Sequence, residues 1–237
     1  MKKIAYTTDS HLDEQFPKEK GVDARQNWQR ILDDVASKSI NNIIFGGDIG
    51  EYTSNKWFFD SLADFKFNIT LGNHDTFAEV IKHYKLASWV STDELYYAFE
   101  DEFFKHIYLD SSTEKISATQ FDWFKKALVT TKKILLFVHH PILKINTVVD
   151  ERYPLKGREK IKSALHKIQN EITLFCGHCH TSDVRTEDNI TQIMTTAASY
   201  QVEKNLEKII LNTEFFGYTI IEIERDKVNF EPIILKN

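Results

Sequence analysis

Glycine is scarce in this sequence: eight residues in 237 is about half of the usual fraction, roughly 7%. We expect so few glycines to be kept where the backbone demands them. Long apolar runs are also absent. Stretches such as 134–138 are far shorter than the ~18 residues of a membrane span, so none is predicted. Without a linker-like segment or an internal repeat, the simplest organisation is a single domain over residues 1–237.

Cysteine and positive charge are limited as well. Cys176 and Cys179 are too few for a disulfide scaffold, and the short apolar stretch at the N-terminus is no secretory signal, so we expect a cytoplasmic protein. The formal net charge of −5 argues against stable nucleic-acid binding through a basic surface. A nuclease stays open, since bound metals can supply local positive charge. The apolar fraction of 42% excludes a disordered chain.

Short apolar, β-branched runs recur along the chain, and each predicts a strand. They are residues 3–8, 42–45, 67–71, 95–99, 106–109, 134–138, 172–175, 192–195, 217–224 and 228–234. Between them, apolar residues recur at helical spacing over 28–36, 121–128 and 161–168, and Ser117 with Gln120 has the spacing of a capping box. Strands alternating with helices over about 180 residues predict the α/β class, with a β-rich closing segment from about 190.

Five of the predicted strands end in polar residues that can bind metal. These ends are Asp9-Ser10-His11, Gly46-Gly47-Asp48, Gly72-Asn73-His74-Asp75, His139-His140-Pro141 and Gly177-His178-Cys179-His180. Ligand sites of α/β sheets form at the carboxyl ends of strands, so the five loops can converge. Carboxylate plus imidazole suits Zn, Mn or Fe better than Ca or Mg alone. Each motif alone is common, but the five together predict one metal centre.

In this order, the motifs resemble the pattern of the calcineurin-like metallophosphoesterase superfamily: Asp-x-His, Gly-Asp, Gly-Asn-His-Asp/Glu, His and Gly-His-x-His. The chain is closer still to the class III cyclic-nucleotide phosphodiesterases and their relatives. That similarity lies in Leu-Asp-Ser at 109–111, Gln120 with Trp123, His-His-Pro at 139–141 and Ser-Tyr-Gln at 199–201. The resemblance implies a four-layer α/β/β/α sandwich of two mixed sheets flanked by helices, the metallo-dependent phosphatase fold.

The resemblance also implies two divalent or trivalent metal ions, Mn, Fe or Zn, and it assigns ligand residues to each ion. The first ion would be held by Asp9, His11 and His180, the second by Asn73, His139 and His178, with Asp48 bridging the two. His139 is preferred over His140 because the first histidine of such a pair is the family's usual ligand.

Other residues are expected around the metals. By the same resemblance, His74 would be the acid near the leaving group, with Asp75 orienting its imidazole, and His140 would line the substrate pocket. Residues 142–157 form a long connection, and long loops beside active sites often contact substrate. Lys156 and Arg158 are therefore candidate anion contacts, although a solvated loop is the plainer interpretation.

The implied reaction is hydrolysis of phosphoester bonds, most favourably of small-molecule phosphodiesters such as cyclic nucleotides, by a hydroxide that bridges the metals. A phosphomonoesterase and a nuclease on the same fold remain alternatives. A non-catalytic scaffold is a third, although it should have lost ligands. Residues 176–180 also match the C-x-x-C-H pattern of haem attachment, but both histidines belong to the phosphoesterase pattern, so we expect no haem. A homo-oligomer is compatible with the sequence.

Overall fold

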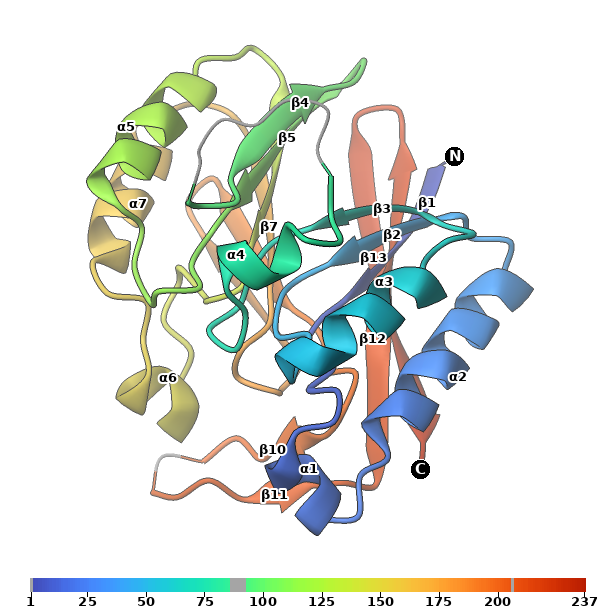
Figure 1. The fold of residues 1–237 in the computed structure, drawn as a ribbon. Helices are drawn as coiled ribbons and strands as arrows, with labels where there is room; N and C mark the ends of the chain where they lie inside the picture. The colour runs from blue at the N-terminus through green and yellow to red at the C-terminus, as the bar shows by residue number, and fades with distance from the viewer. Residues whose placement is uncertain (1, 86–92, 206) are drawn as a thin grey trace.

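Two β-sheets pack face to face, with helices on the outer side of each (Figure 1). The computed structural model describes residues 2–85, 93–205 and 207–237. The first sheet has the strand order β13 (Lys227–Lys236), β12 (Phe215–Glu224), β1 (Lys2–Thr7), β2 (Asn42–Phe45) and β3 (Lys66–Ile69). The second has the order β4 (Tyr97–Glu100), β5 (Phe104–Leu109), β6 (Lys133–Val138), β7 (Ile172–Cys176), β9 (Ile190–Met194) and β8 (Asp183–Glu187).

Both sheets are mixed, as predicted. Strands β1, β2 and β3 are parallel to one another, and so are β5, β6, β7 and β9, while β12, β4 and β8 run antiparallel to their neighbours. The carboxyl ends of the parallel strands in a sheet lie at one edge, which gathers the loops that follow them. A small separate sheet pairs β10 (Gln201–Val202) with β11 (Leu211–Asn212).

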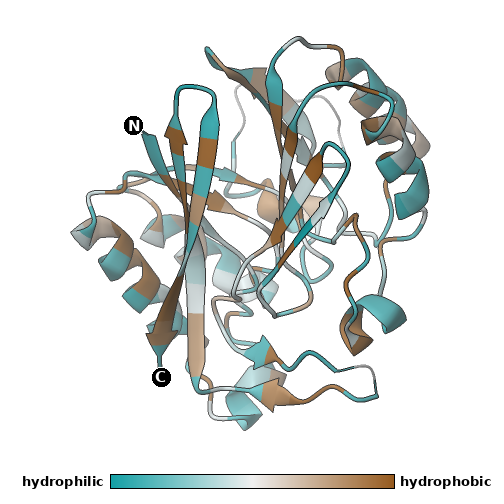
Figure 2. Ribbon diagram, turned by 180° about the vertical axis from the view of Figure 1, so that it is seen from behind, coloured by the Kyte–Doolittle hydropathy of each residue, from teal (hydrophilic) through white to brown (hydrophobic). Residues whose placement is uncertain are grey.

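Helices α2 and α3 cover the first sheet, and α5 and α7 cover the second (Figure 1). The described helices are α1 (Gln15–Glu19), α2 (Ala24–Ser37), α3 (Asn55–Ser61), α4 (Phe77–Val80), α5 (Ala118–Ala127), α6 (Val148–Arg152) and α7 (Arg158–Leu165), with a 3-10 turn at Tyr52–Ser54. Along the helices in Figure 2, hydrophobic and hydrophilic bands alternate, as expected for helices with one buried face. Over the described residues, no helix is long and apolar enough to cross a membrane.

The aromatic residues form the core between the two sheets. Tyr6 on β1 packs against Phe137 on β6 and Phe175 on β7, with ring centroids 5.9 and 5.4 Å apart. Tyr108 on β5 stacks on Phe137 at 4.8 Å. All four rings are fully buried, and such pairs add to the free energy gained from burial alone. Side chains of both sheets thus share one hydrophobic core.

Several sequence-based boundaries were wrong. The strand predicted over 67–71 ends at Ile69, because the next residues leave the sheet for the Gly-Asn-His-Asp loop. The edge strand β8 was missed, because its residues are mostly polar and exposed. The connection 142–157 is not a solvated loop: it contains α6, and residues such as Ile142 and Leu143 are buried.

The capping box at the start of α5 forms only in part. Ser117 Oγ accepts a hydrogen bond from the Gln120 backbone N–H at 3.0 Å, as predicted. The Gln120 side chain does not return to Ser117. Its amide instead accepts from the Asp110 N–H at 2.8 Å and donates to the Asp110 carbonyl at 3.0 Å. Gln120 is fully buried, so it pairs the backbone at the end of β5, beside the site.

The segment after β6 is fixed by a buried amide. Gln192 on β9 accepts hydrogen bonds from the backbone N–H groups of Ile142 and Leu143, at 2.8 and 2.7 Å, and donates to the Leu143 carbonyl at 2.9 Å. These three bonds hold the chain just beyond His139 and His140. Without the amide, three buried backbone groups would have no partner.

Gln192→Met keeps the length of the side chain and removes the amide. We expect the free energy of unfolding to fall by at least about 3 kcal/mol, since three groups lose their partners and each unpaired buried group costs roughly 1–3 kcal/mol. Urea denaturation of metal-free protein measures it, with the exposed Gln169→Met as a control that changes it by under about 0.5 kcal/mol. If Gln192→Met had the same free energy of unfolding as the wild type, the segment would be held by other contacts.

Candidate metal centre

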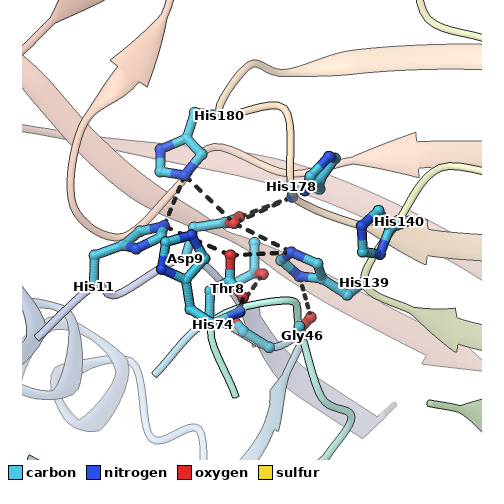
Figure 3. A network of polar contacts seen from close by, with 12 residues as sticks. Thr8, Asp9, His11, Gly46, His74, His139, His140, His178 and His180 are labelled. Carbon is cyan, nitrogen blue, oxygen red and sulfur yellow. Dashed lines mark hydrogen bonds and ion pairs between the residues drawn. The ribbon is translucent and has the colours of Figure 1, made fainter. Parts of the chain in front are cut away.

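The polar strand ends meet at one place between the sheets (Figure 3). His139 Nε2 lies 3.2 Å from Asp48 Oδ2, and His180 Nε2 lies 3.5 Å from Asp9 Oδ1. His11 Nε2 lies 2.9 Å from His180 Nε2. Three overlapping groups of potential metal ligands result: Asp9 with His11 and His180, Asp9 with Asp48 and His139, and His11 with Glu14 and His74. Loops that follow strands of both sheets therefore contribute to one buried cluster.

Backbone carbonyls fix the protonation of the imidazoles. His180 Nδ1 lies 2.8 Å from the Tyr200 carbonyl, and His139 Nδ1 lies 2.9 Å from the Gly46 carbonyl. A carbonyl oxygen only accepts, so each Nδ1 donates a proton and the neutral ring keeps a lone pair on Nε2. On His180 this lone pair faces Asp9, whereas His139 Nε2 faces Asp48, whose charge raises the pKa of His139 and holds a proton that a metal ion would displace. Metal-binding histidines are commonly held in this way by a partner on the other ring nitrogen.

His178 and His11 are held similarly. His178 Nε2 donates to the Tyr153 carbonyl at 2.9 Å, which leaves the lone pair on Nδ1. His11 Nδ1 lies 3.0 Å from Glu14 Oε2, so its Nε2 points at that of His180. A proton on His11 Nε2, donated to the lone pair of His180, joins the two nitrogens, since the pKa of His11 is raised by Glu14 and that of His180 is lowered by burial. A metal ion could take the place of this proton.

Unpartnered atoms complete the cluster. Among the described residues, His139 Nε2 and Asn73 Oδ1 are buried side-chain atoms without a hydrogen-bond partner. Such atoms carry a large desolvation cost unless a ligand pairs them. Amide oxygen, imidazole nitrogen and carboxylate oxygen are all ligands of first-row transition metals. The residues present therefore fit the binding of such metal ions.

The local backbone is strained where the ligands sit. Five candidate ligands have φ between 45° and 69°: Asp9, His11, Asp48, His178 and His180. Left-handed conformations at non-glycine residues cost about 1–3 kcal/mol each and gather at functional sites. Glycine permits the close approach of these loops. A Cβ on Gly72 would overlap the Asp48 carboxylate, and one on Gly177 would overlap Asp9 and Thr8.

The imidazoles of the cluster fall into two groups by pKa. Burial alone would lower the pKa of His139 and of His11, but the charge of Asp48 raises that of His139 to about 9, and the hydrogen bond with Glu14 raises that of His11. Burial, and then the charge of His139, lowers the pKa of His178 to about 4. Burial also lowers the pKa of His180 to about 4. Burial alone would raise the pKa of Asp48, but His139 lies beside it and holds that pKa well below its usual range. Near neutral pH, His178 and His180 therefore present lone pairs, and Asp48 presents negative charge, to a cation.

Asp75 does not orient His74, contrary to the sequence-based expectation. Its carboxylate accepts three backbone N–H bonds, from Asp48 at 2.7 Å and from Ile49 and Gly72 at 2.9 Å each. It therefore ties the loop after β2 to the loop after β3. Burial and the nearby charge of Asp48 raise the pKa of Asp75 to about 6.

His74 is held by Glu14 instead. His74 Nδ1 lies 2.9 Å from Glu14 Oε1, while the other oxygen of Glu14 contacts His11. The His74 backbone N–H donates to Asp48 Oδ1 at 2.9 Å. Burial would lower the pKa of His74, but the hydrogen bond with Glu14 and the charge of Asp48 raise it to about 9.

Three predicted substrate contacts do not line the cavity beside the cluster. His140 is fully buried; its Nδ1 lies 2.8 Å from Ser111 Oγ, and its ring packs on His178 at 4.1 Å. Lys156 pairs with Glu114, and Arg158 pairs with the buried Asp150, each at 2.6 Å. Both cations are therefore compensated by carboxylates away from the cavity.

Sequence reasoning missed Glu14 and two carbonyls, those of Tyr153 and Tyr200. Glu14 follows His11 by three residues, a spacing that could have suggested a contact. Tyr200 lies in the Ser-Tyr-Gln segment that the resemblance had singled out. Its ring also packs on His180, with centroids 4.4 Å apart. No sequence signal marks the Tyr153 carbonyl, because any residue type could supply it.

The family is shown by comparison with known proteins. The family model described as calcineurin-like phosphoesterase matches residues 2–182. The chain therefore belongs to the calcineurin-like phosphoesterase family, and its two-sheet architecture is the metallo-dependent phosphatase fold.

Particular relatives are similar over most of the chain. A protein of Fibrobacter succinogenes, described as a probable cyclic nucleotide phosphodiesterase, is 24% identical over 93% of this chain and 89% of the relative. One of Arcobacter nitrofigilis, described as a probable glycerophosphodiester phosphodiesterase, is 31% identical over 70% of this chain and 66% of the relative. The crystal structure of a dimetal phosphatase from Danio rerio matches with a TM-score of 0.72 at 12% identity, over 99% of this chain and 98% of that one; this shows the fold alone.

Asp48→Asn tests the metal centre directly. The amide removes the negative charge that faces His139 and His11, so we expect metal content after purification to fall from two ions per chain to one or none. Added Mn²⁺ should also lose most of its effect on the melting temperature, since only bound ions stabilise the fold. Elemental analysis and thermal melting measure both quantities. Asp64→Asn, an exposed carboxylate, is the control, and full metal content in Asp48→Asn would contradict the predicted bridge.

Proposed function

We propose that this chain is a dinuclear-metal-dependent hydrolase of small-molecule phosphodiesters. One observation carries the proposal: Asp48 and several imidazoles of the buried cluster line a cavity whose lining also includes His74, and the second buried carboxylate, Asp9, lies in the same cluster. Cations at this cluster and a proton donor beside it are the two requirements for cleaving a phosphoester.

The proposed ligand sets are those implied by the family resemblance. They are Asp9, His11 and His180 for one ion, Asn73, His139 and His178 for the other, and Asp48 between them. When bound, such a pair lowers the pKa of a water toward neutrality and offsets the negative charge of the phosphoryl oxygens. The protein's part is to hold the ligand atoms in place through the Tyr200, Gly46 and Tyr153 carbonyls.

His74 is the proposed general acid. Its Nδ1 is occupied by Glu14, so Nε2 is the atom left to donate a proton to the departing oxygen. Its side chain is 43% exposed and lines the cavity. A general acid must be accessible to the substrate in this way. We propose Glu14 as a positioning residue, because its carboxylate contacts His74 and His11 together.

A diester is favoured over a monoester by the charges around the cavity. No lysine or arginine is among the described residues that line it. A diester carries one negative charge at the phosphate, which metal ions can meet alone, whereas a monoester brings nearly a second one. The two relatives described above, both named as probable phosphodiesterases of small substrates, agree with this preference. The cavity of about 270 Å³ also suits a small molecule.

His74→Ala should damage alkyl diesters far more than activated aryl diesters. An alkoxide needs a proton as it leaves and 4-nitrophenolate does not, so we expect a loss of roughly 100- to 10,000-fold in kcat for alkyl substrates and under about tenfold for aryl substrates. Steady-state kinetics at equal metal content measure both. Equal losses on the two classes would remove His74 from the role of acid.

A double-mutant cycle with Glu14→Gln tests the positioning role. If Glu14 acts through His74, Glu14→Gln should lower kcat on alkyl diesters by about 10- to 100-fold in wild type and by under about threefold in the His74→Ala background. Metal content is measured in parallel, because loss of an ion would place Glu14 among the ligands. Glu19→Gln on α1 is the matched control. Additive effects of the two substitutions would contradict the coupling.

A further inference from the structure

Exposed apolar side chains gather around the cavity of the metal centre. Phe16, Tyr153 and Ile209 are 48%, 50% and 39% exposed, and all three line this one cavity. They belong to α1, to the end of α6 and to the connection between β10 and β11, which lie together at one end of the molecule (Figure 1). Single exposed apolar residues are ordinary, but such a cluster from three separate segments marks a binding surface.

The apolar surface continues inward to the metal ligands. Val149, Val202 and Leu211 also line the cavity, and the two valines are buried. We call the six residues Phe16, Val149, Tyr153, Val202, Ile209 and Leu211 the apolar wall. Tyr200 joins this wall to the metal centre, because its ring lies 4.4 Å from the His180 ring and 6.2 Å from the Phe16 ring.

Charge is confined to the floor of the cavity. Asp48 is the one acidic residue in its described lining, and the basic groups there are imidazoles. Two cations next to lining segments have other contacts: Lys20 Nζ lies over the Phe16 ring, and Arg152 donates to the Glu207 carbonyl at 3.1 Å. If the phosphate of a substrate binds at the metal centre, the rest of the substrate therefore contacts apolar side chains rather than charged ones.

We infer that the apolar wall binds one uncharged aromatic substituent of the phosphodiester and excludes substituents that carry a second negative charge. This inference rests on the proposed function, since the phosphoryl group anchors the substrate beside the wall. With about 270 Å³, the cavity has room for a phosphoryl group and one ring-sized substituent. A charged substituent would lose its hydration next to the apolar side chains without gaining an ion pair or a hydrogen bond.

The size of the effect follows from the area that the wall covers. Burying a ring in place of a methyl group removes on the order of 100 Å² of apolar surface from water, which corresponds to roughly 10- to 100-fold in affinity. The Phe16 and Tyr153 rings can also stack on an aromatic ligand, and an alkyl chain of equal area lacks that contribution.

Binding without turnover is the first test. The O-methyl monoesters of phenylphosphonate and methylphosphonate share a singly charged head group, as a phosphodiester does, and differ only in the substituent on phosphorus. On Mn²⁺-loaded protein, calorimetry should give about 10- to 100-fold tighter binding of the phenyl compound. The combined Tyr153→Ala and Ile209→Ala variant should reduce this ratio to under about threefold, while Phe230→Ala, an exposed ring on β13 outside the cavity, should leave it unchanged. Equal affinities in the wild type would overturn the inference.

Turnover is the second test. Three diesters with the same 4-nitrophenolate leaving group carry methyl, phenyl or 2-carboxyethyl as the other substituent. We expect kcat/KM to be highest for phenyl and lowest for carboxyethyl, chiefly through KM, because the wall acts on bound substrate throughout the reaction. Ile209→Lys should raise kcat/KM for the carboxyethyl diester at least about tenfold by supplying the missing cation.

The outcomes separate the two proposals. Hydrolysis of all three diesters at equal kcat/KM, with equal phosphonate affinities, would contradict the apolar wall and leave the phosphodiesterase proposal standing. Preferred binding of the phenylphosphonate ester with no hydrolysis of any diester, at full metal content, would contradict the proposed function and leave the wall standing as a binding site.

Discussion

The burial of two carboxylates at the strand ends governs how the surrounding loops are arranged. Asp9 and Asp48 are buried; His139 forms an ion pair with Asp48, and the lone pair of His180 points at Asp9. Negative charge and lone pairs held together out of water are costly without a cation. The surrounding hydrogen bonds hold the carboxylates and imidazoles in these positions. Carbonyls fix the imidazole tautomers, and Asp75 fastens the loop that carries Asp48.

The same place is where the two sheets are joined. Asp9 follows β1 of the first sheet, while His139 and His178 follow β6 and β7 of the second. Direct bonds already cross this boundary: His178 N–H donates to the Asp9 carboxylate at 3.2 Å, and His139 donates to the Gly46 carbonyl. A metal pair would add ligand bonds across the same boundary. Metal binding and sheet packing are therefore coupled, since any ion bound only by the folded chain stabilises the fold.

Local sequence patterns predict the strands well where both faces are buried. The runs at 134–138 and 172–175 correspond closely to β6 and β7 because burial on both faces requires continuous apolar residues. The same logic fails for β8, an edge strand whose polar residues carry no such signal. It also fails for α6, which is short and held by contacts distant in sequence, such as the bond from Val148 N–H to the Asn205 carbonyl.

The candidate ligands could be predicted because residue type and spacing indicate their chemistry. The groups that hold these ligands in place could not be predicted. Glu14 and Asp75 are both carboxylates near histidines in the sequence, and only the three-dimensional paths of their loops decide which one contacts His74. The Tyr153 and Tyr200 carbonyls are backbone groups and leave no trace in the sequence. The cavity lining was hidden for a related reason, because Phe16, Tyr153 and Ile209 come from three distant segments.

The left-handed backbone at the ligand residues has a consequence for how such a chain can change. Asp9, Asp48 and His178 occupy conformations that glycine adopts without strain. Replacement of Asp9 or Asp48 by glycine would relieve local backbone strain and remove a ligand. It would also leave the backbone N–H of His178 or of His74 without its carboxylate partner. The strained conformation and the hydrogen bonds of each carboxylate are thus tied to the same side chain, so the backbone cannot relax at these positions without loss of contacts that join the strand ends.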